Sequence, residues 1–147
     1  MEEKLLACRK KALSLLKYRD RTEWELVTRL EDQEFTEEEI EDAVAYVRSF
    51  HYIDDLRYAK RFAEMHSESR SVKRIRQDLQ KKHISAEYIE LALEEIAFDD
   101  SAALRKELKK RMKGRQELAD EEKQKIAAGL YRKGFRTSDI FREMDAL

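Results

Sequence analysis

Side chains suited to catalysis are few and scattered in this sequence of 147 residues. The three histidines, His51, His66 and His83, are well separated, and the single cysteine, Cys8, falls on an apolar helical face. A nucleophilic cysteine needs an activating base, whereas a cysteine among apolar residues is typical of a core. The three glycines do not have the spacing of a phosphate-binding loop. We therefore predict that the protein is not an enzyme and uses no cofactor.

One group of residues, His51 with Asp54 and Asp55, has types that could surround a metal ion. The aspartates also begin a predicted helix, however, and the pair Asp99 and Asp100 begins another. A carboxylate at a helix start binds the free amides and favours the positive end of the helix dipole. We therefore expect helix capping here, with no metal and no small-molecule substrate.

Positive side chains form the second group with functional chemistry, because they bind phosphates and acidic protein surfaces. In SVKRIRQDLQKK, residues 71–82, five of twelve residues are Lys or Arg, and helical periodicity places Lys73, Arg74 and Lys81 opposite Ile75. Positive charge recurs in RKELKKRMKGR, residues 105–115. We predict that a basic strip binds a partner or DNA; its members are Arg70, Lys73, Arg74, Arg76, Lys81, Lys82, Lys109, Lys110, Arg132, Lys133 and Arg136. The alternative is a solvated helix face.

The charge is unevenly distributed along the chain. Residues 1–48 carry 9 basic and 13 acidic side chains, residues 49–98 carry 9 and 9, and residues 99–147 carry 13 and 10. The thirds therefore have net charges of −4, 0 and +3, within a total of −1. Such polarity indicates contact with nucleic acid or with a charged partner.

The elements that must position these residues are helices. The chain has no proline, only three glycines and 43% charged residues, which is typical of a strongly helical protein. Thr22 followed by Glu25, and Thr36 followed by Glu39, fit the capping box. Helices are therefore expected to begin near residues 23 and 37.

The sequence contains three copies of one pattern. Residues 22–47 align without a gap on residues 71–96 at an offset of 49, and a third copy follows at an offset of 51. In this alignment Thr36 meets Ser85, and Gly134 follows a predicted helix end. The matching apolar positions, which we expect to be buried, are Leu26, Leu30, Phe35, Ile40, Ala43, Val44 and Val47 in the first copy, Ile75, Leu79, Ile84, Ile89, Ala92, Leu93 and Ile96 in the second, and Ile126, Leu130, Phe135, Ile140, Met144 and Leu147 in the third.

A further helix precedes each copy, near residues 3–18, 55–68 and 100–113. We therefore predict an all-α, elongated array of three tandem three-helix repeats, with boundaries at 1–50, 51–98 and 99–147. Each repeat alone would be marginally stable, so neighbouring repeats are expected to share apolar surface.

These segments resemble a known family. YIDDLRYAKRFAE (52–64), followed by SVKRIRQDLQKKHISAEYIELALEEI (71–96), is similar to the central signature of the RecX regulators. ALSLLKYRDRTEWELVTRL (12–30) and YRKGFRTSDI (131–140) resemble the first and closing repeats of that family. The family usually has Gly near positions 71 and 83, where this chain has Ser71 and His83.

The resemblance implies a regulator that binds the RecA nucleoprotein filament and inhibits its ATPase, strand-exchange and coprotease activities, with weak contact to single-stranded DNA. Such a protein acts in DNA repair, recombination and the SOS response. The alternative is a sequence-nonspecific, architectural DNA-binding protein. A recognition helix for the major groove is disfavoured, because residues 86–96 hold four Glu and no Arg, Lys, Asn or Gln to donate to base edges.

Two further expectations concern aromatic residues and location. Tyr52, Tyr58 and Phe62 could pack between helices or touch a partner, and both alternatives remain open. The charged start MEEKLLACRKKAL has no apolar leader core, no run is long enough to span a membrane, and one cysteine allows no disulfide within the chain. We expect a cytoplasmic protein without membrane contact.

Overall fold

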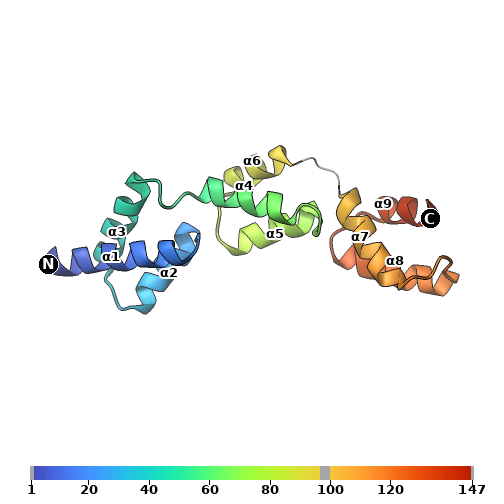
Figure 1. Ribbon diagram of the computed structural model, residues 1–147, viewed down its shortest axis with the longest axis horizontal. Coiled ribbons are helices and arrows are strands. Elements are labelled where there is room, and N and C mark those ends of the chain that lie inside the picture. The colour runs from blue at the N-terminus through green and yellow to red at the C-terminus, as the bar shows by residue number, and fades with distance from the viewer. Residues whose placement is uncertain (1, 97–99, 147) are drawn as a thin grey trace. The chain divides into compact units, whose positions relative to one another are not determined.

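The computed structural model describes residues 2–96 and 100–146, and all regular structure within them is helical (Figure 1). The helices are α1 (Glu2–Tyr18), α2 (Glu23–Asp32), α3 (Glu37–Ser49), α4 (Asp55–His66), α5 (Val72–Lys81), α6 (Ala86–Glu95), α7 (Ser101–Met112), α8 (Asp120–Arg132) and α9 (Thr137–Asp145). The predicted all-α array of three tandem three-helix repeats is therefore confirmed. We call α1–α3, α4–α6 and α7–α9 repeats 1, 2 and 3. None of these helices is both long and apolar enough to cross a bilayer.

Local capping explains where several helices begin. The Thr22 and Thr36 hydroxyls each accept a 3.2 Å hydrogen bond from the backbone N–H of Glu25 and Glu39. Both glutamate side chains accept a hydrogen bond in return from the threonine N–H, so both predicted capping boxes are confirmed. Ser85 accepts from the N–H of Tyr88 at 3.3 Å, in the place equivalent to Thr36.

The chain divides into two compact units, one formed by Met1–Ala59 with Leu79–Ile89 and the other by Lys60–Asp78 with Glu90–Leu147. The core of the first unit joins α1, α2 and α3 with Ile53, and the core of the second joins α7, α8 and α9. The matching apolar positions are buried as predicted, with one correction. Phe35 is only half-buried and packs at the edge of the first core. Leu147 and Asp99 lie outside the described residues. The elongated outline and the repeat boundaries stay predictions.

The turns between the second and third helix of each repeat share one backbone conformation. Glu34, His83 and Gly134 occupy equivalent positions and have φ of 67°, 59° and 102°. This left-handed conformation suits glycine, and other residues adopt it at a modest cost. His83 therefore adopts this turn conformation without being a glycine.

Candidate partner and nucleic-acid surface

Two aspartates connect the repeats through the free N-terminal amides of helices. Asp55 Oδ1 accepts a 2.8 Å hydrogen bond from the N–H of Glu23 at the start of α2. Asp100 Oδ1 accepts one of 2.8 Å from the N–H of Val72 at the start of α5. In both cases the carboxylate comes from the repeat that follows, so the contact recurs along the array.

These contacts correct part of the capping prediction. Asp54 caps its own helix, since its Oδ1 accepts from the N–H of Arg57 at 3.0 Å. The expected cap from the pair Asp54 and Asp55 is thus provided by Asp54, whereas Asp55 caps α2 instead. Asp100 makes no side-chain capping bond to α7, and its neighbour Asp99 lies outside the described residues. Asp54 and Asp55 are adjacent in the sequence but cap two different helices, α4 and α2. Burial raises the pKa of Asp55, while the hydrogen bond from Glu23 opposes that shift.

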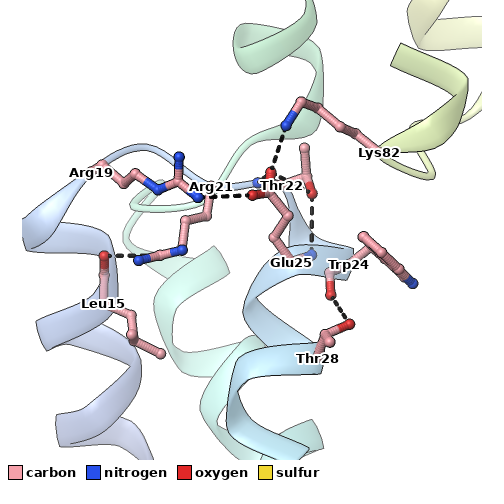
Figure 2. A network of polar contacts seen from close by, with 8 residues as sticks. All are labelled: Leu15, Arg19, Arg21, Thr22, Trp24, Glu25, Thr28 and Lys82. Atoms are coloured by element: carbon pink, nitrogen blue, oxygen red, sulfur yellow. Dashed lines mark hydrogen bonds and ion pairs between the residues drawn. The ribbon is translucent and has the colours of Figure 1, made fainter. Parts of the chain in front are cut away.

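Lys82 of the predicted strip contacts one residue of α2 and one of α4. Its Nζ lies 3.5 Å from Glu25 Oε1 (Figure 2). The same Nζ lies 5.5 Å from the centre of the Tyr58 ring. Next to it, the indole of Trp24 stacks on the imidazole of His83, with ring centres 4.1 Å apart and planes inclined by 10°. The turn after α5 is thus fixed by an ion pair and two ring contacts.

Glu25 is the hub of the polar network in Figure 2. Its carboxylate completes the Thr22 capping box, lies 3.4 Å from Arg19 and pairs with Lys82. The neighbouring Arg21 is buried and donates from Nε to the carbonyl of Leu15 at 3.2 Å. Burial lowers the pKa of Arg21, and the positive charge of Arg19 adds to this effect.

In the second unit, the start of α5 contacts the turn between α8 and α9. Ser71 donates from Oγ to the carbonyl of Lys133 at 2.8 Å and accepts from the N–H of Arg74 at 3.1 Å. A Cβ at Gly134 would lie 2.5 Å from Ser71 Oγ, closer than side chains approach. Gly134 is therefore required for this close contact as well as for its positive φ.

Three strip residues meet around this contact. Arg70, Arg74 and Lys133 line a hollow of about 250 Å³ beside Ser71. Asp78 forms ion pairs with both arginines: its Oδ2 lies 2.7 Å from Arg70 Nη1, and its Oδ1 lies 3.0 Å from Arg74 Nε. Lys133 Nζ pairs with Glu107 Oε2 at 3.0 Å. Carboxylates thus partly offset this basic cluster.

Arg76 is paired across its own repeat. Its Nε and Nη2 lie 2.9 and 3.3 Å from the two carboxylate oxygens of Glu90, which connects α5 to α6. The hydrogen bond from Arg76 lowers the pKa of Glu90.

The remaining members of the strip are exposed and make no ion pair within the described part of the chain: Lys73, Lys81, Lys109, Lys110, Arg132 and Arg136. Lys73, Arg74 and Lys81 are exposed, as the helical periodicity predicted. Lys81 and Lys82 belong to the first unit, and the other strip residues belong to the second. A single continuous strip therefore remains a prediction.

The aromatic residues Phe62 and Tyr52 differ in how they pack. Phe62 packs on His66 with ring centres 4.5 Å apart, whereas Tyr52 is 51% exposed and stacks on Phe50 at 5.5 Å.

Cys8 is fully buried, and burial, with the charges of Glu39 and Asp42, raises its pKa to about 11. A thiol with this pKa stays protonated at neutral pH, which suits a core residue.

Sequence reasoning missed the residues that join the repeats, above all Trp24, His83 and the reach of Asp55 to Glu23. Two signals were present. Trp24 is the single tryptophan and lies outside the matching apolar positions, and an aspartate recurs where the first helix of repeats 2 and 3 begins.

Comparison with known proteins matches three family models along this chain. RecX first three-helix domain matches residues 8–46, RecX second three-helix domain matches residues 54–93, and RecX third three-helix domain matches residues 99–144.

Curated relatives agree with these matches. The chain is 33% identical to the regulatory protein RecX of Vibrio campbellii over 110 residues, which cover 74% of this chain and 71% of the relative. It is 32% identical to that of Haemophilus influenzae over 139 residues, which cover 90% and 88%. The match to the Geobacillus protein, 33% over 138 residues, covers only 50% of that longer relative.

Solved structures share the fold. A crystal structure of regulatory protein RecX has a TM-score of 0.84 at 25% identity and covers 98% of this chain and 72% of its own. The crystal structure of RecX from Lactobacillus salivarius has a TM-score of 0.83 at 22% identity over the whole of both chains, and this second likeness supports the fold alone.

Proposed function

This chain belongs to the RecX family of regulatory proteins, and from that premise we propose that it binds the RecA nucleoprotein filament and inhibits its ATPase, strand-exchange and coprotease activities. The observation that carries the proposal is the set of exposed cations that form no ion pair within residues 2–96 and 100–146, represented by Lys73 and Lys81 on α5. Such side chains are available to phosphates or to acidic protein surface.

The arrangement suits binding rather than catalysis. The cysteine thiol is buried and protonated, and Asp54 and Asp55 are engaged by backbone amides. Repeats that each present a few weak contacts gain affinity together when one filament engages several of them. We propose the three repeats, 1–50, 51–98 and 99–147, as the modules of that binding, with weak contact to the single strand in the filament. The protein would act in the cytoplasm, in DNA repair, recombination and the SOS response.

A second function is favoured by one observation. Lys109, Lys110, Arg132 and Arg136 are exposed in repeat 3, which belongs to the most basic third of the chain. Cations of this kind bind the phosphates of any nucleic acid. The alternative is therefore sequence-nonspecific binding of duplex DNA, as in an architectural protein.

ATP turnover by preformed RecA filaments on single-stranded DNA distinguishes these functions. We expect turnover to fall as the purified protein is added, with half-inhibition at concentrations well below those that saturate bare duplex. Unchanged turnover together with saturable binding to duplex would contradict filament inhibition and support the architectural alternative.

A further inference from the structure

A groove in repeat 1 combines an apolar floor with an acidic rim. It lies between α2 and α3, has a volume of about 540 Å³ and belongs wholly to the first unit. Its floor consists of Val27, Phe35, Ile40 and Val44. The rim consists of Glu23, Glu31, Glu37, Glu41 and Arg48. Four glutamates against one arginine leave three net negative charges around an apolar surface.

The one positive side chain of the rim is already paired. Arg48 already forms an ion pair with Glu23. Within residues 2–96 and 100–146, Glu31, Glu37 and Glu41 form no ion pair. Among the residues that the structure describes, these three carboxylates therefore have no paired cation.

Repeat 2 shows what fills the equivalent place. At the offset of 49, Val27 corresponds to Arg76 and Glu41 corresponds to Glu90. Arg76 and Glu90 form the bidentate pair that connects α5 to α6, with distances of 2.9 and 3.3 Å. In repeat 1 the shorter, apolar Val27 cannot make this contact. The carboxylate of Glu41 is therefore present, but no guanidinium from position 27 pairs with it.

Repeat 3 fills the same place by another means. Ala127 and Phe141 correspond there to Val27 and Glu41. Phe141 packs against the core of repeat 3, to which Ala127 belongs. In repeats 2 and 3, side chains of the repeat itself therefore fill the place between its second and third helices. In repeat 1 the corresponding place is an apolar floor beneath carboxylates that form no ion pair among the described residues. The fold alone does not require that difference.

We propose that this groove binds a basic amphipathic helix of a partner protein. An arginine or lysine of that helix takes the place that Arg76 holds in repeat 2 and pairs with Glu41. Apolar residues on the same face cover Val27 and Phe35, as in other complexes where a helix lies in a groove. Since α2 has 10 residues and is about 15 Å long, two to three turns of the partner helix fit along it. This inference goes beyond the recombinase proposal and does not depend on it.

The probe is a synthetic peptide of about 14 residues, long enough for an isolated helix to form in part. It carries leucines at i, i+3, i+4 and i+7 with flanking arginines, and a matched peptide carries glutamate in place of each arginine. Titration of the full chain by calorimetry should give one basic peptide per chain, with an affinity that falls as salt is raised. The acidic peptide should not bind. Equal binding of both peptides would overturn the charge argument.

Three variants test the place of binding. Val27→Arg rebuilds the pair of repeat 2 within the groove and is expected to weaken peptide binding by at least about tenfold. Glu41→Arg, at an exposed position, should do the same, which guards against a folding defect in the first variant. Arg76→Val is the control in repeat 2: the positions equivalent to Glu23, Glu31 and Glu37 are there Val72, Gln80 and Ala86, so without an acidic rim the number of bound peptides should stay at one. Helical circular dichroism checks that each variant is folded.

Two outcomes would make the proposal wrong. Unchanged peptide affinity in folded Val27→Arg and Glu41→Arg would place binding elsewhere. If the chain alone dimerises in light scattering and Val27→Arg makes it monomeric, the occupant is a second copy of this chain rather than a basic helix of a partner. Neither outcome bears on filament inhibition, which is measured separately.

Discussion

The Asp55 carboxylate accepts a 2.8 Å hydrogen bond from the backbone N–H of Glu23, so the first helix of repeat 2 caps the second helix of repeat 1. The first amides of a helix have no partner inside the helix and need an acceptor from outside. Asp100 provides one to Val72 in the same way, also at 2.8 Å. The capping that usually stabilises one helix here connects successive repeats.

Removing this acceptor should destabilise the protein. Asp55→Ala leaves the amide of Glu23 without its partner, and we expect a loss of about 1–2 kcal/mol in the free energy of unfolding. Asp55→Asn retains an acceptor oxygen and should lose clearly less. Urea denaturation measures both variants, and equal losses would mean that the hydrogen bond is not the cause.

The repeat alignment predicts a large effect in the core of repeat 2. Leu79 is fully buried, as are the equivalent Leu30 and Leu130. Leu79→Ala should therefore reduce the free energy of unfolding by about 2–5 kcal/mol. Leu6→Ala on α1, where the side chain is 61% exposed, is the control and should change it by less than about 0.5 kcal/mol. A small loss at Leu79 would contradict the alignment.

The outward face of α5 can be tested with two charge reversals that differ in cost. Arg74 Nε lies 3.0 Å from Asp78, so Arg74→Glu replaces an attraction with a repulsion and should cost roughly 0.5–1 kcal/mol. Lys81 is exposed and makes no ion pair in the described ranges, so Lys81→Glu should leave the melting temperature nearly unchanged. Both should weaken inhibition of the RecA ATPase. Full inhibition by folded Lys81→Glu would remove that residue from the contact surface.

The raised pKa of Cys8 predicts that the protein loses stability at alkaline pH. Its pKa in the folded protein is about 11, against an ordinary value of 9.0, so the folded state keeps a proton that the unfolded state releases. This contribution to stability is therefore full below about pH 9 and is lost as the pH rises towards 11. Urea denaturation across that range should show a steeper decline in wild type than in Cys8→Ala. Parallel curves would contradict the raised pKa.

Salt dependence separates the proposed function from its alternative. If about four phosphates are neutralised on bare single-stranded DNA, log affinity should fall against log salt with a slope of about −3. Protein contacts in a filament are less sensitive to salt, so the preference for RecA-coated strands should widen between about 50 and 200 mM. Fluorescence anisotropy with coated single strands, bare single strands and duplex measures this. Equal or tighter binding to duplex at the higher salt would contradict filament regulation.

Much of the fold could be predicted from the sequence because its signals are local. A capping box such as Thr22 with Glu25 involves residues one helical turn apart, and the buried positions recur with the period of a helix. The offsets of 49 and 51 then identified Leu30, Leu79 and Leu130 as equivalent, and all three are fully buried. The left-handed turn at Gly134 could be predicted for the same reason, since it depends on its own backbone.

The helices, their repeat and the outward faces could therefore be predicted from residue patterns alone. Which charges are paired over long sequence distances became visible only in the packed structure: Arg76 pairs with Glu90, and Lys82 pairs with Glu25. The tertiary structure also decided that Asp55 caps α2 rather than its own helix. The physical reason is that a hydrogen bond or ion pair depends on two groups within a few ångströms, and residues 32 or 57 positions apart meet only when whole helices pack.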